Sequence, residues 1–300
     1  MSDDRLPIAH AAALGAIQGP AELLPVSSSG HLVLVPAMLG WPYRELDPEI
    51  RKSVEVALHA GGAVALLIGL RKEVREYLRS FGLHNLASLT LSFTPAALIA
   101  LRFERPIERR LSEPYPVAIA LIAGSVAMAI ADGRPERRSR EQASLMDAIV
   151  IGAAQAFALA PGVSRNGATL TAARWRGFRR ADANVISRQI ALPVIVGASV
   201  LKGARLARRE FPPGVGTGMA AGAVAAFSST LVSMRLIAML ERSRSLLPYA
   251  AYRTALGVAA LFALRKRAAA RREVPASLNG HRAAAPAPDP AVHRRPAVIR

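Results

Sequence analysis

A short polar motif, "PVSSSGH" at residues 25–31, interrupts an apolar stretch of sequence that covers residues 6–39. A second motif, "PGVSRNGAT" at residues 161–169, lies in a similarly apolar setting. Polar groups that leave water must find hydrogen-bond partners, because an unpaired group costs free energy. We therefore expect the two motifs to lie together in the folded chain and to satisfy each other.

The sequence around the motifs has the composition of a membrane protein. Of its 300 residues 52% are hydrophobic, and the mean hydropathy is +0.26. Apolar runs with hardly any charge are separated by arginine-bearing segments, and each is near the roughly 17–25 residues that a helix needs to cross a bilayer. Two runs are short, which leaves buried helices of a soluble protein as the alternative, but six runs favour an all-α integral membrane protein with about six transmembrane helices. The runs are residues 54–70, 86–101, 116–131, 185–201, 214–240 and 246–264.

The positive charge is distributed as expected for a protein that lies in lipid. The formal net charge is +18, and arginines cluster at residues 134–140, between apolar runs, and at residues 265–272. Such flanking charge anchors helices at anionic lipid headgroups. Aromatic residues make up only 5% of the chain, which disfavours a base-stacking surface, and no cysteine is present for a disulfide or a thiolate metal site. The expected partner is the bilayer and not a nucleic acid.

The two motifs belong to an internal repeat. When residues 11–31 are shifted by 137 positions onto residues 148–168, eight of 21 positions are identical without a gap. Chance similarity of two helices rich in alanine and glycine is the alternative. The repeat places three apolar runs after each motif, and an odd number of crossings gives the halves opposite orientations, as in inverted-topology repeats. We assign repeat one to about residues 6–131 and repeat two to about residues 145–265.

Beyond the repeat the composition of the chain changes. Residues 268–300 are basic and rich in proline and alanine, a composition that cannot build a hydrophobic core and predicts a disordered tail. The polytopic membrane domain is therefore expected to cover residues 1–267.

Prolines and a glycine break the helices at both motifs. Pro20, Pro25 and Pro36 are expected to interrupt the first motif, and Pro161 with Gly162 the second. Non-helical backbone at membrane depth is tolerated only where protein or water satisfies its polar groups. We therefore expect the motifs to form two re-entrant helical hairpins that face one another and line a cavity.

The first hairpin carries the side chains of a reactive centre. Gln18 and Glu22 are four residues apart, so they share one face of a helix. An ionisable group at membrane depth is a functional candidate, because its uncompensated burial is costly; the alternative for Glu22 is a structural ion pair. A nucleophilic hydroxyl group needs a neighbouring base, such as Glu22 or His31. The alternative is a set of serine caps that opens the next helix. The hydroxyl groups belong to Ser27, Ser28 and Ser29.

The second hairpin adds a cation. Arg165 is the one arginine of its motif, between Ser164 and Asn166, and Gly167 and Thr169 follow. A guanidinium group, small hydroxyl groups and glycine-freed backbone amides at the start of a helix are the parts that hold a phosphate. A turn with an arginine that reaches the membrane surface is the alternative.

Together the two hairpins predict phosphoryl chemistry at a membrane. A carboxylate beside phosphate oxygens is a usual setting for a divalent cation, Mg²⁺ or Ca²⁺. The substrate would be an amphiphile whose diphosphate headgroup enters the cavity while its tail stays in the bilayer. The hypothesis is an in-line attack by Ser28, with Arg165 and the cation stabilising the charge and His31 handling a proton.

These motifs resemble those of a known family. "QGPAELLPVSSSGH" resembles the (E/Q)xxxE segment and the following PVSSxGH of the bacterial undecaprenyl-diphosphate phosphatases, also called bacitracin resistance proteins, and "PGVSRNGAT" is similar to their PGxSRSGxT. The run "VEVALHAGGAVALL" and the later "YRTALG" also fit, so the resemblance covers about residues 6–265. It implies a multi-pass protein of the bacterial inner membrane that releases inorganic phosphate from undecaprenyl diphosphate and so recycles the carrier lipid of cell-wall synthesis. A homodimer is a further expectation.

The resemblance also implies roles for individual residues. Glu22 is the expected metal ligand or acid–base residue, with Gln18 as the second member of the metal pair. Ser28 is the expected nucleophile, His31 the expected acid–base residue and Arg165 the catalytic cation. The expected substrate-binding residues are Ser27, Ser29, Ser164, Asn166 and Thr169.

Three positions depart from the family pattern. One is His59, where many relatives carry glutamine, and it is assigned no role. Asn166 stands where the family has serine, so a hydroxyl group becomes an amide. Gln18 cannot ionise, which leaves metal coordination at that pair to Glu22. A catalytically lapsed relative is therefore one alternative. Another is a lipid-phosphate flippase that uses the same headgroup site without chemistry, since inverted repeats with broken helices are common in transporters.

Overall fold

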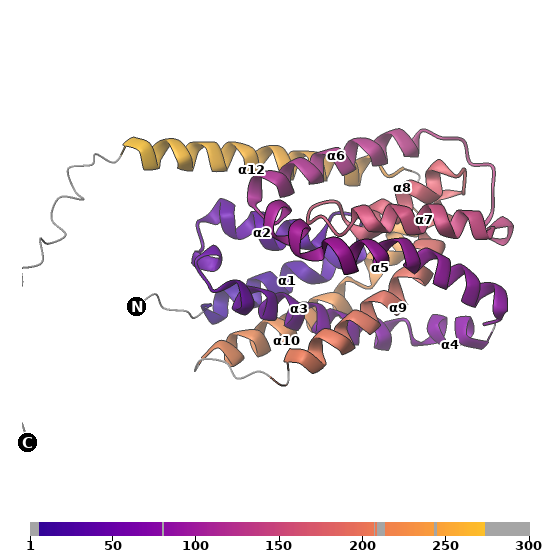
Figure 1. Cartoon of the computed structure of the whole chain (residues 1–300), viewed down its shortest axis with the longest axis horizontal. Helices are drawn as coiled ribbons and strands as arrows, with labels where there is room; N and C mark the ends of the chain where they lie inside the picture. Colours follow the sequence, from indigo (N-terminus) through magenta and orange to yellow (C-terminus); the bar gives the residue numbers. More distant parts are fainter. Residues whose placement is uncertain (1–5, 80, 207, 209–213, 243–244, 274–300) are drawn as a thin grey trace, which may run out of the picture. The chain divides into compact units, whose positions relative to one another are not determined.

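Helices make up almost all of the described structure that carries the two polar motifs (Figure 1). The computed structural model describes residues 6–79, 81–206, 208, 214–242 and 245–273. Within those residues the only extended pairing is an isolated bridge between Arg138 and Phe178. The chain divides into two compact units, Met1–Leu264 and Arg265–Arg300, and both motifs lie in the first unit.

Twelve α-helices and two short 3-10 helices follow one another in the described part of the chain. They are α1 (Ile8–Leu23), α2 (Ser28–Leu39), η1 (Pro42–Arg44), α3 (Pro48–Gly69), α4 (Arg71–Arg79), α5 (Leu83–Leu111), α6 (Pro114–Asp132), η2 (Arg140–Gln142), α7 (Leu145–Phe157), α8 (Arg165–Trp175), α9 (Arg180–Leu206), α10 (Val215–Ser233), α11 (Arg235–Arg242) and α12 (Leu247–Glu273).

Five of the described helical segments are long and apolar enough to cross a membrane, so the chain is a multi-pass helical membrane protein. They coincide with five of the six predicted runs. The sixth run, residues 185–201, lies in α9, which is not one of these segments; several of its side chains lie outside the described residues. The five segments are Pro48–Gly69, Leu83–Leu111, Pro114–Asp132, Val215–Met239 and Leu247–Ala270.

Each polar motif forms a short loop between two helices. Residues 24–27 join α1 to α2, and residues 158–164 join α7 to α8. α1 and α7 begin at residues 137 positions apart, and so do α2 and α8. The sequence offset between the motifs is therefore also the offset between the helices that carry them.

Equivalent serines end the two loops in the same unusual conformation. Ser27 has φ 75° and Ser164 has φ 71°, values that residues other than glycine rarely adopt. Each hydroxyl oxygen caps the following helix, because it accepts a hydrogen bond from the backbone amide of Gly30 or Gly167, at 3.2 Å and 3.1 Å. The cap holds each chain in a sharp turn into its helix.

The prolines of the first motif act differently from one another. Only Pro25 lies in the loop, whereas Pro20 is inside α1 and Pro36 is inside α2. The prediction that all three interrupt the motif is wrong for those two, because a proline inside a helix removes one hydrogen bond without ending the helix. In the second motif Pro161 and Gly162 both lie in the loop, as predicted.

The first helix of each motif packs against a long helix of the other half. α1 lies against α10, and α7 lies against α5. Equivalent glycines permit both crossings: a Cβ atom on Gly15 would collide with the carbonyl oxygen of Gly222, and one on Gly152 would lie 2.6 Å from that of Ser92. The backbones approach this closely only because no side chain stands between them.

A buried carboxylate holds the segment that leads from α6 to α7. The Asp147 side chain is 2% exposed and accepts hydrogen bonds from Arg138 at 2.7 Å, from Arg176 at 2.6 Å and from the Ser144 amide at 2.8 Å. Burial alone would raise the pKa of the Asp147 carboxyl group, but these hydrogen bonds outweigh it and hold the pKa well below its usual value. The start of the second motif's first helix is thereby fixed.

The predicted boundary of the tail needs a correction. α12 continues to Glu273, so residues 268–273 are helical and not disordered. Alanines and arginines there are good helix formers, and they extend the helix that precedes them. Residues 274–300 of the predicted tail lie outside the described residues.

Candidate active site

Glu22, in the last turn of α1, lies at the centre of the site. Its side chain is only 9% exposed, yet both carboxylate oxygens have partners. Oε1 accepts a hydrogen bond from Arg165 Nη2 at 2.9 Å. Oε2 accepts one from Ser28 Oγ at 2.8 Å and one from Gln18 Nε2 at 3.2 Å. The buried negative charge is therefore compensated by a cation and two neutral donors.

Ser28 and Glu22 have the geometry of a nucleophile and its base. Ser28 is the first residue of α2, and the preceding Ser27 supplies the helix cap. The Ser28 hydroxyl group is therefore left to line the cavity and to donate to the Glu22 carboxylate. The separation of 2.8 Å is within the range in which a carboxylate can take a hydroxyl proton.

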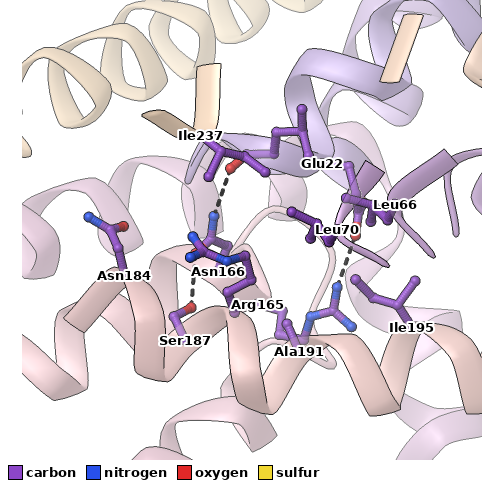
Figure 2. A pocket seen from close by; sticks show the side chains of 12 residues that line it. Glu22, Leu66, Leu70, Arg165, Asn166, Asn184, Ser187, Ala191, Ile195 and Ile237 are labelled. Atoms are coloured by element: carbon purple, nitrogen blue, oxygen red, sulfur yellow. Dashed lines mark hydrogen bonds and ion pairs between the residues drawn. The ribbon is translucent and has the colours of Figure 1, made fainter. Parts of the chain in front are cut away.

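Two side chains at the start of α8 join the second motif to the last turn of α1 (Figure 2). Arg165 forms the ion pair with Glu22, and Asn166 Nδ2 donates to the backbone carbonyl oxygen of Leu23 at 3.1 Å. Asn166 Oδ1 accepts a hydrogen bond from Ser187 Oγ, on α9, at 2.9 Å. The start of α8, in the second motif, is thus in direct contact with the last turn of α1, which leads into the first motif.

A cavity of about 720 Å³ lies beside these residues. Its polar lining includes Glu22, Ser28, Ser29, Ser164 and Arg165. Its remaining walls include small and apolar side chains of α3 and α5, and Lys52 pairs with Glu108 across these two helices at 3.0 Å. A second pocket, of about 60 Å³, also borders Glu22 and Arg165 (Figure 2). The apolar residues of α3 and α5 in these walls are Val56, Phe93, Ala96, Ala97, Ala100 and Ile107.

His31 lies beside the site without lining the cavity. It is 5% exposed, and its Nδ1 is 2.8 Å from the carbonyl oxygen of Ser27. A carbonyl oxygen only accepts, so Nδ1 carries the proton and Nε2 accepts from the Tyr252 hydroxyl group at 2.7 Å in the neutral ring. The two rings also stack, with centroids 5.7 Å apart. In this arrangement both ring nitrogens are occupied by residues other than Ser28.

The expected substrate-binding residues fall into two groups. Ser29, Ser164 and Asn166 line the cavity. Ser27 and Thr169 do not: each is buried, and the Thr169 hydroxyl group faces the Arg165 carbonyl oxygen at 3.0 Å and the Ser187 hydroxyl group at 2.5 Å. Their contacts are those of residues that shape the start of a helix.

Sequence reasoning did not assign His59 or Ser187 to the site. His59, on α3, places Nδ1 2.9 Å from Gln18 Nε2 and 3.6 Å from the nearer Glu22 carboxylate oxygen. Ser187, on α9, supports Asn166. In the sequence they stand out only as a lone histidine and a lone serine inside apolar runs. Only the packing of α3 and α9 around the loops places them next to the site.

The donor set fits a hard divalent cation that is shared with a phosphate. No group of three or more histidine, aspartate and glutamate side chains converges anywhere in the described residues. Mg²⁺, however, is commonly held by one or two carboxylates together with substrate phosphate oxygens. Glu22 supplies the carboxylate, and Gln18 Oε1 is buried without a hydrogen-bond partner among the described residues. Both predicted ligands therefore present oxygen atoms, the donor type that such a cation prefers.

The fold and the site together define a class of protein: a multi-pass helical membrane protein in which two polar loops join a carboxylate, a serine and an arginine beside a cavity. A family model narrows this class. The model of the bacitracin resistance protein BacA matches residues 11–259, and the chain belongs to this family.

Individual relatives agree with the family match. The undecaprenyl-diphosphatase of Geobacter sulfurreducens is 37% identical over 268 residues, which are 85% of this chain and 97% of the relative. That of Campylobacter curvus is 32% identical, over 85% of this chain and 98% of the relative. That of Chromohalobacter salexigens is 35% identical, over 84% of this chain and 97% of the relative. The similarity therefore extends over nearly the whole length of each relative.

Proposed function

We propose that this protein hydrolyses undecaprenyl diphosphate to undecaprenyl phosphate and inorganic phosphate. The observation that carries the proposal is the position of Glu22, which binds Ser28 of the first motif and Arg165 of the second. The family match and the relatives named undecaprenyl-diphosphatase supply the substrate. They do not favour the flippase alternative, and a binding site without chemistry has no need of a serine on a buried carboxylate.

The chemistry follows from the contacts at Glu22. Ser28 Oγ attacks the terminal phosphorus while Glu22 takes its proton, so that the Oγ–P bond forms and the bond from phosphorus to the bridging oxygen breaks. Glu22 returns the proton to the departing lipid phosphate. Water then attacks the phosphoserine, Glu22 takes its proton and passes it to Ser28 Oγ, and inorganic phosphate leaves.

Arg165 exchanges partners in this mechanism. In the structure its guanidinium group neutralises Glu22, and its Nε atom is buried without a hydrogen-bond partner among the described residues. An arriving phosphate offers this group a second anion with a matching planar geometry. The guanidinium group then stabilises the charge that spreads over the phosphoryl oxygens. The same movement frees a Glu22 oxygen.

A divalent cation is part of the proposal. Mg²⁺ or Ca²⁺, when bound by Glu22 and Gln18 together with the headgroup, neutralises phosphate charge. His31 stays a predicted acid–base residue. Glu22, and not His31, contacts Ser28, and His31 acts on the proton only if the Tyr252 hydroxyl group gives up Nε2.

The proposed membrane arrangement is an inverted repeat whose motifs are re-entrant hairpins. Three observations support it: the common offset of the paired helices, the matching serine turns, and the reciprocal packing of α1 on α10 and α7 on α5. The headgroup would lie beside Glu22, Ser28 and Arg165 while the prenyl chain follows the apolar side chains of α5 between Phe93 and Ala100. Placement in the bacterial inner membrane and assembly as a homodimer are further parts of the proposal.

Phosphate release tests the proposal. Purified protein in detergent, given a C55 prenyl diphosphate and Mg²⁺, should release inorganic phosphate, and Ser28→Ala should release at least about a hundredfold less. Ser228→Ala, an exposed position on α10 that does not line the cavity, is the matched control. EDTA should stop the reaction, and added Mg²⁺ or Ca²⁺ should restore it. Substrate binding without phosphate release by the wild type would identify a transporter or a lapsed enzyme.

A further inference from the structure

One buried arginine donates hydrogen bonds to the loops of both motifs and forms no ion pair within the described residues. Arg253, on α12, is 0% exposed. Its guanidinium group donates to the carbonyl oxygen of Pro25 at 3.3 Å, in the first loop, and to those of Gly162 at 3.4 Å and Val163 at 2.8 Å, in the second. None of the carboxylates in the described residues forms an ion pair with it. Three loop carbonyl groups are therefore its hydrogen-bond partners.

Two glycines make room for this guanidinium group. A Cβ atom on Gly124, in α6, would collide with Arg253 Nη2. A Cβ atom on Gly167, in α8, would lie 2.5 Å from Nη1. Helices α6, α8 and α12 thus leave a space that fits the planar group between the loops. The guanidinium group is held in a fitted site and does not lie loosely in a gap.

The loop carbonyl groups explain why a charge is placed there. Residues of a loop have no helical partner for their carbonyl oxygens, and buried carbonyl groups need donors. An apolar side chain could fill the same volume at a lower desolvation cost, but it could not bond both loops. Arginine carries five donors in a rigid plane, so one side chain can fix carbonyl groups that come from different segments.

We infer that Arg253 is a positioning residue: it holds the two loops at one spacing, so that Glu22 and Ser28, on either side of the first loop, meet Arg165, directly after the second, around one headgroup. The inference rests on the proposed phosphatase function. It assigns Arg253 no contact with substrate. Its action on the reaction runs through the backbone of residues 24–27 and 158–164.

Kinetics of purified variants provide the first test. Arg253→Met should lower kcat about a hundredfold, because a displacement of about 1 Å between reacting groups costs that much. KM should change by less than about threefold, since the headgroup ligands remain in place. Arg253→Lys should lower kcat about tenfold, because an ammonium group keeps the charge but lacks the planar fork.

Gly124→Ala provides a version of the same test that keeps the arginine. The new methyl group would displace the guanidinium group from the loop carbonyl groups, so kcat should fall at least about tenfold. The matched control is Arg174→Met. Arg174 is also 0% exposed, and its partners in the described part of the chain are also carbonyl oxygens, but these belong to Phe178, Asp132 and Arg134, outside both loops. Its variant should lose thermal stability and keep kcat, measured per folded protein.

A distance measurement gives a readout that needs no turnover. The chain has no cysteine, so spin labels can be placed at Leu39→Cys and Trp175→Cys, exposed positions near the ends of α2 and α8. Wild-type Arg253 should give one narrow distance between the labels, and Arg253→Met and Gly124→Ala should broaden or shift it. Arg174→Met should not.

The outcomes separate the inference from the proposed function. A wild type that releases no phosphate removes the proposed function, while the label distances still decide whether Arg253 holds the loops. Folded Arg253→Met protein with kcat within about twofold of wild type, or with an unchanged label distance, would overturn the inference. If Arg253→Met does not fold, Arg253→Lys and Gly124→Ala decide by the same two criteria.

Discussion

Replacing Glu22 by glutamine keeps the shape of the side chain and removes its charge and its basicity. In the structure Glu22 Oε2 lies 2.8 Å from the Ser28 hydroxyl group that it would deprotonate, and Oε1 lies 2.9 Å from Arg165 Nη2. An amide cannot take the serine proton, and loss of a general base typically costs about 10²–10⁴ in rate. We expect Glu22→Gln to lower kcat about a thousandfold, which is about 4 kcal/mol of transition-state stabilisation.

The same change should alter folding much less than it alters catalysis. Arg165 loses its anion, but its side chain is 25% exposed, so water compensates part of the loss. We expect a destabilisation of about 1–2 kcal/mol, below that of a fully buried broken pair. Phosphate release and thermal unfolding in detergent measure the two effects. Glu76→Gln, an exposed position on α4, is the matched control for the carboxylate-to-amide change.

Two results would refute the reasoning about Glu22. Phosphate release by folded Glu22→Gln within about tenfold of wild type would remove the carboxylate from the chemistry. A variant that loses activity only in proportion to its loss of folded protein would make Glu22 a structural ion-pair partner of Arg165.

Three further substitutions test the surroundings of the site. Tyr252→Phe removes the hydroxyl group that holds His31 Nε2 and should lower kcat about tenfold if His31 must keep its ring orientation; unchanged kinetics would show that this hydrogen bond is dispensable. Asp147→Asn should destabilise the fold by about 2 kcal/mol at pH 7, by chemical unfolding. Because the pKa of Asp147 is lowered in the folded state, its contribution is present above the unfolded-state pKa and is lost as pH falls through the folded-state pKa. The difference between wild type and variant should shrink in acid, and a constant difference would contradict the ion-pair account. Gly152→Ala should cost about 1–3 kcal/mol, since its Cβ would press on the backbone of α5, whereas Gly216→Ala, with no atom within 4 Å, should be neutral in the same thermal scans; equal effects would remove close packing as the cause.

Local patterns predicted the membrane class and the position of the motifs. Apolar runs of bilayer length are visible along the chain, because a helix in lipid satisfies its own backbone and exposes mostly apolar side chains. Five of the six runs match membrane-length helical segments. The two predictions that fail, helix breaks at Pro20 and Pro36 and disorder at residues 268–273, concern how far a helix continues. Neighbouring turns and packing decide that extent, so the local composition does not.

The residue types of the candidate active site could also be predicted from the sequence. Glu22, Ser28 and Arg165 are polar residues in apolar surroundings, and burial makes such residues conspicuous. Their pairing was not visible, because Glu22 and Arg165 are 143 residues apart and nothing in either motif specifies which carboxylate meets which guanidinium group. The roles of His31 and Thr169 were inferred from their place in the motifs, and both side chains lie outside the cavity lining.

By itself, then, the sequence determined a helical membrane protein with two related polar loops and the chemical groups for phosphate chemistry, since these properties follow from composition, period and local spacing. Only the tertiary structure decided that Glu22 joins Ser28 to Arg165, that His31 turns to Tyr252, and that Arg253 binds both loops. The physical reason is that a buried hydrogen bond depends on distance and direction in space. Helices that are distant in the sequence set that geometry when they pack. The last helix, α12, brings Arg253 to loops that lie far earlier in the sequence.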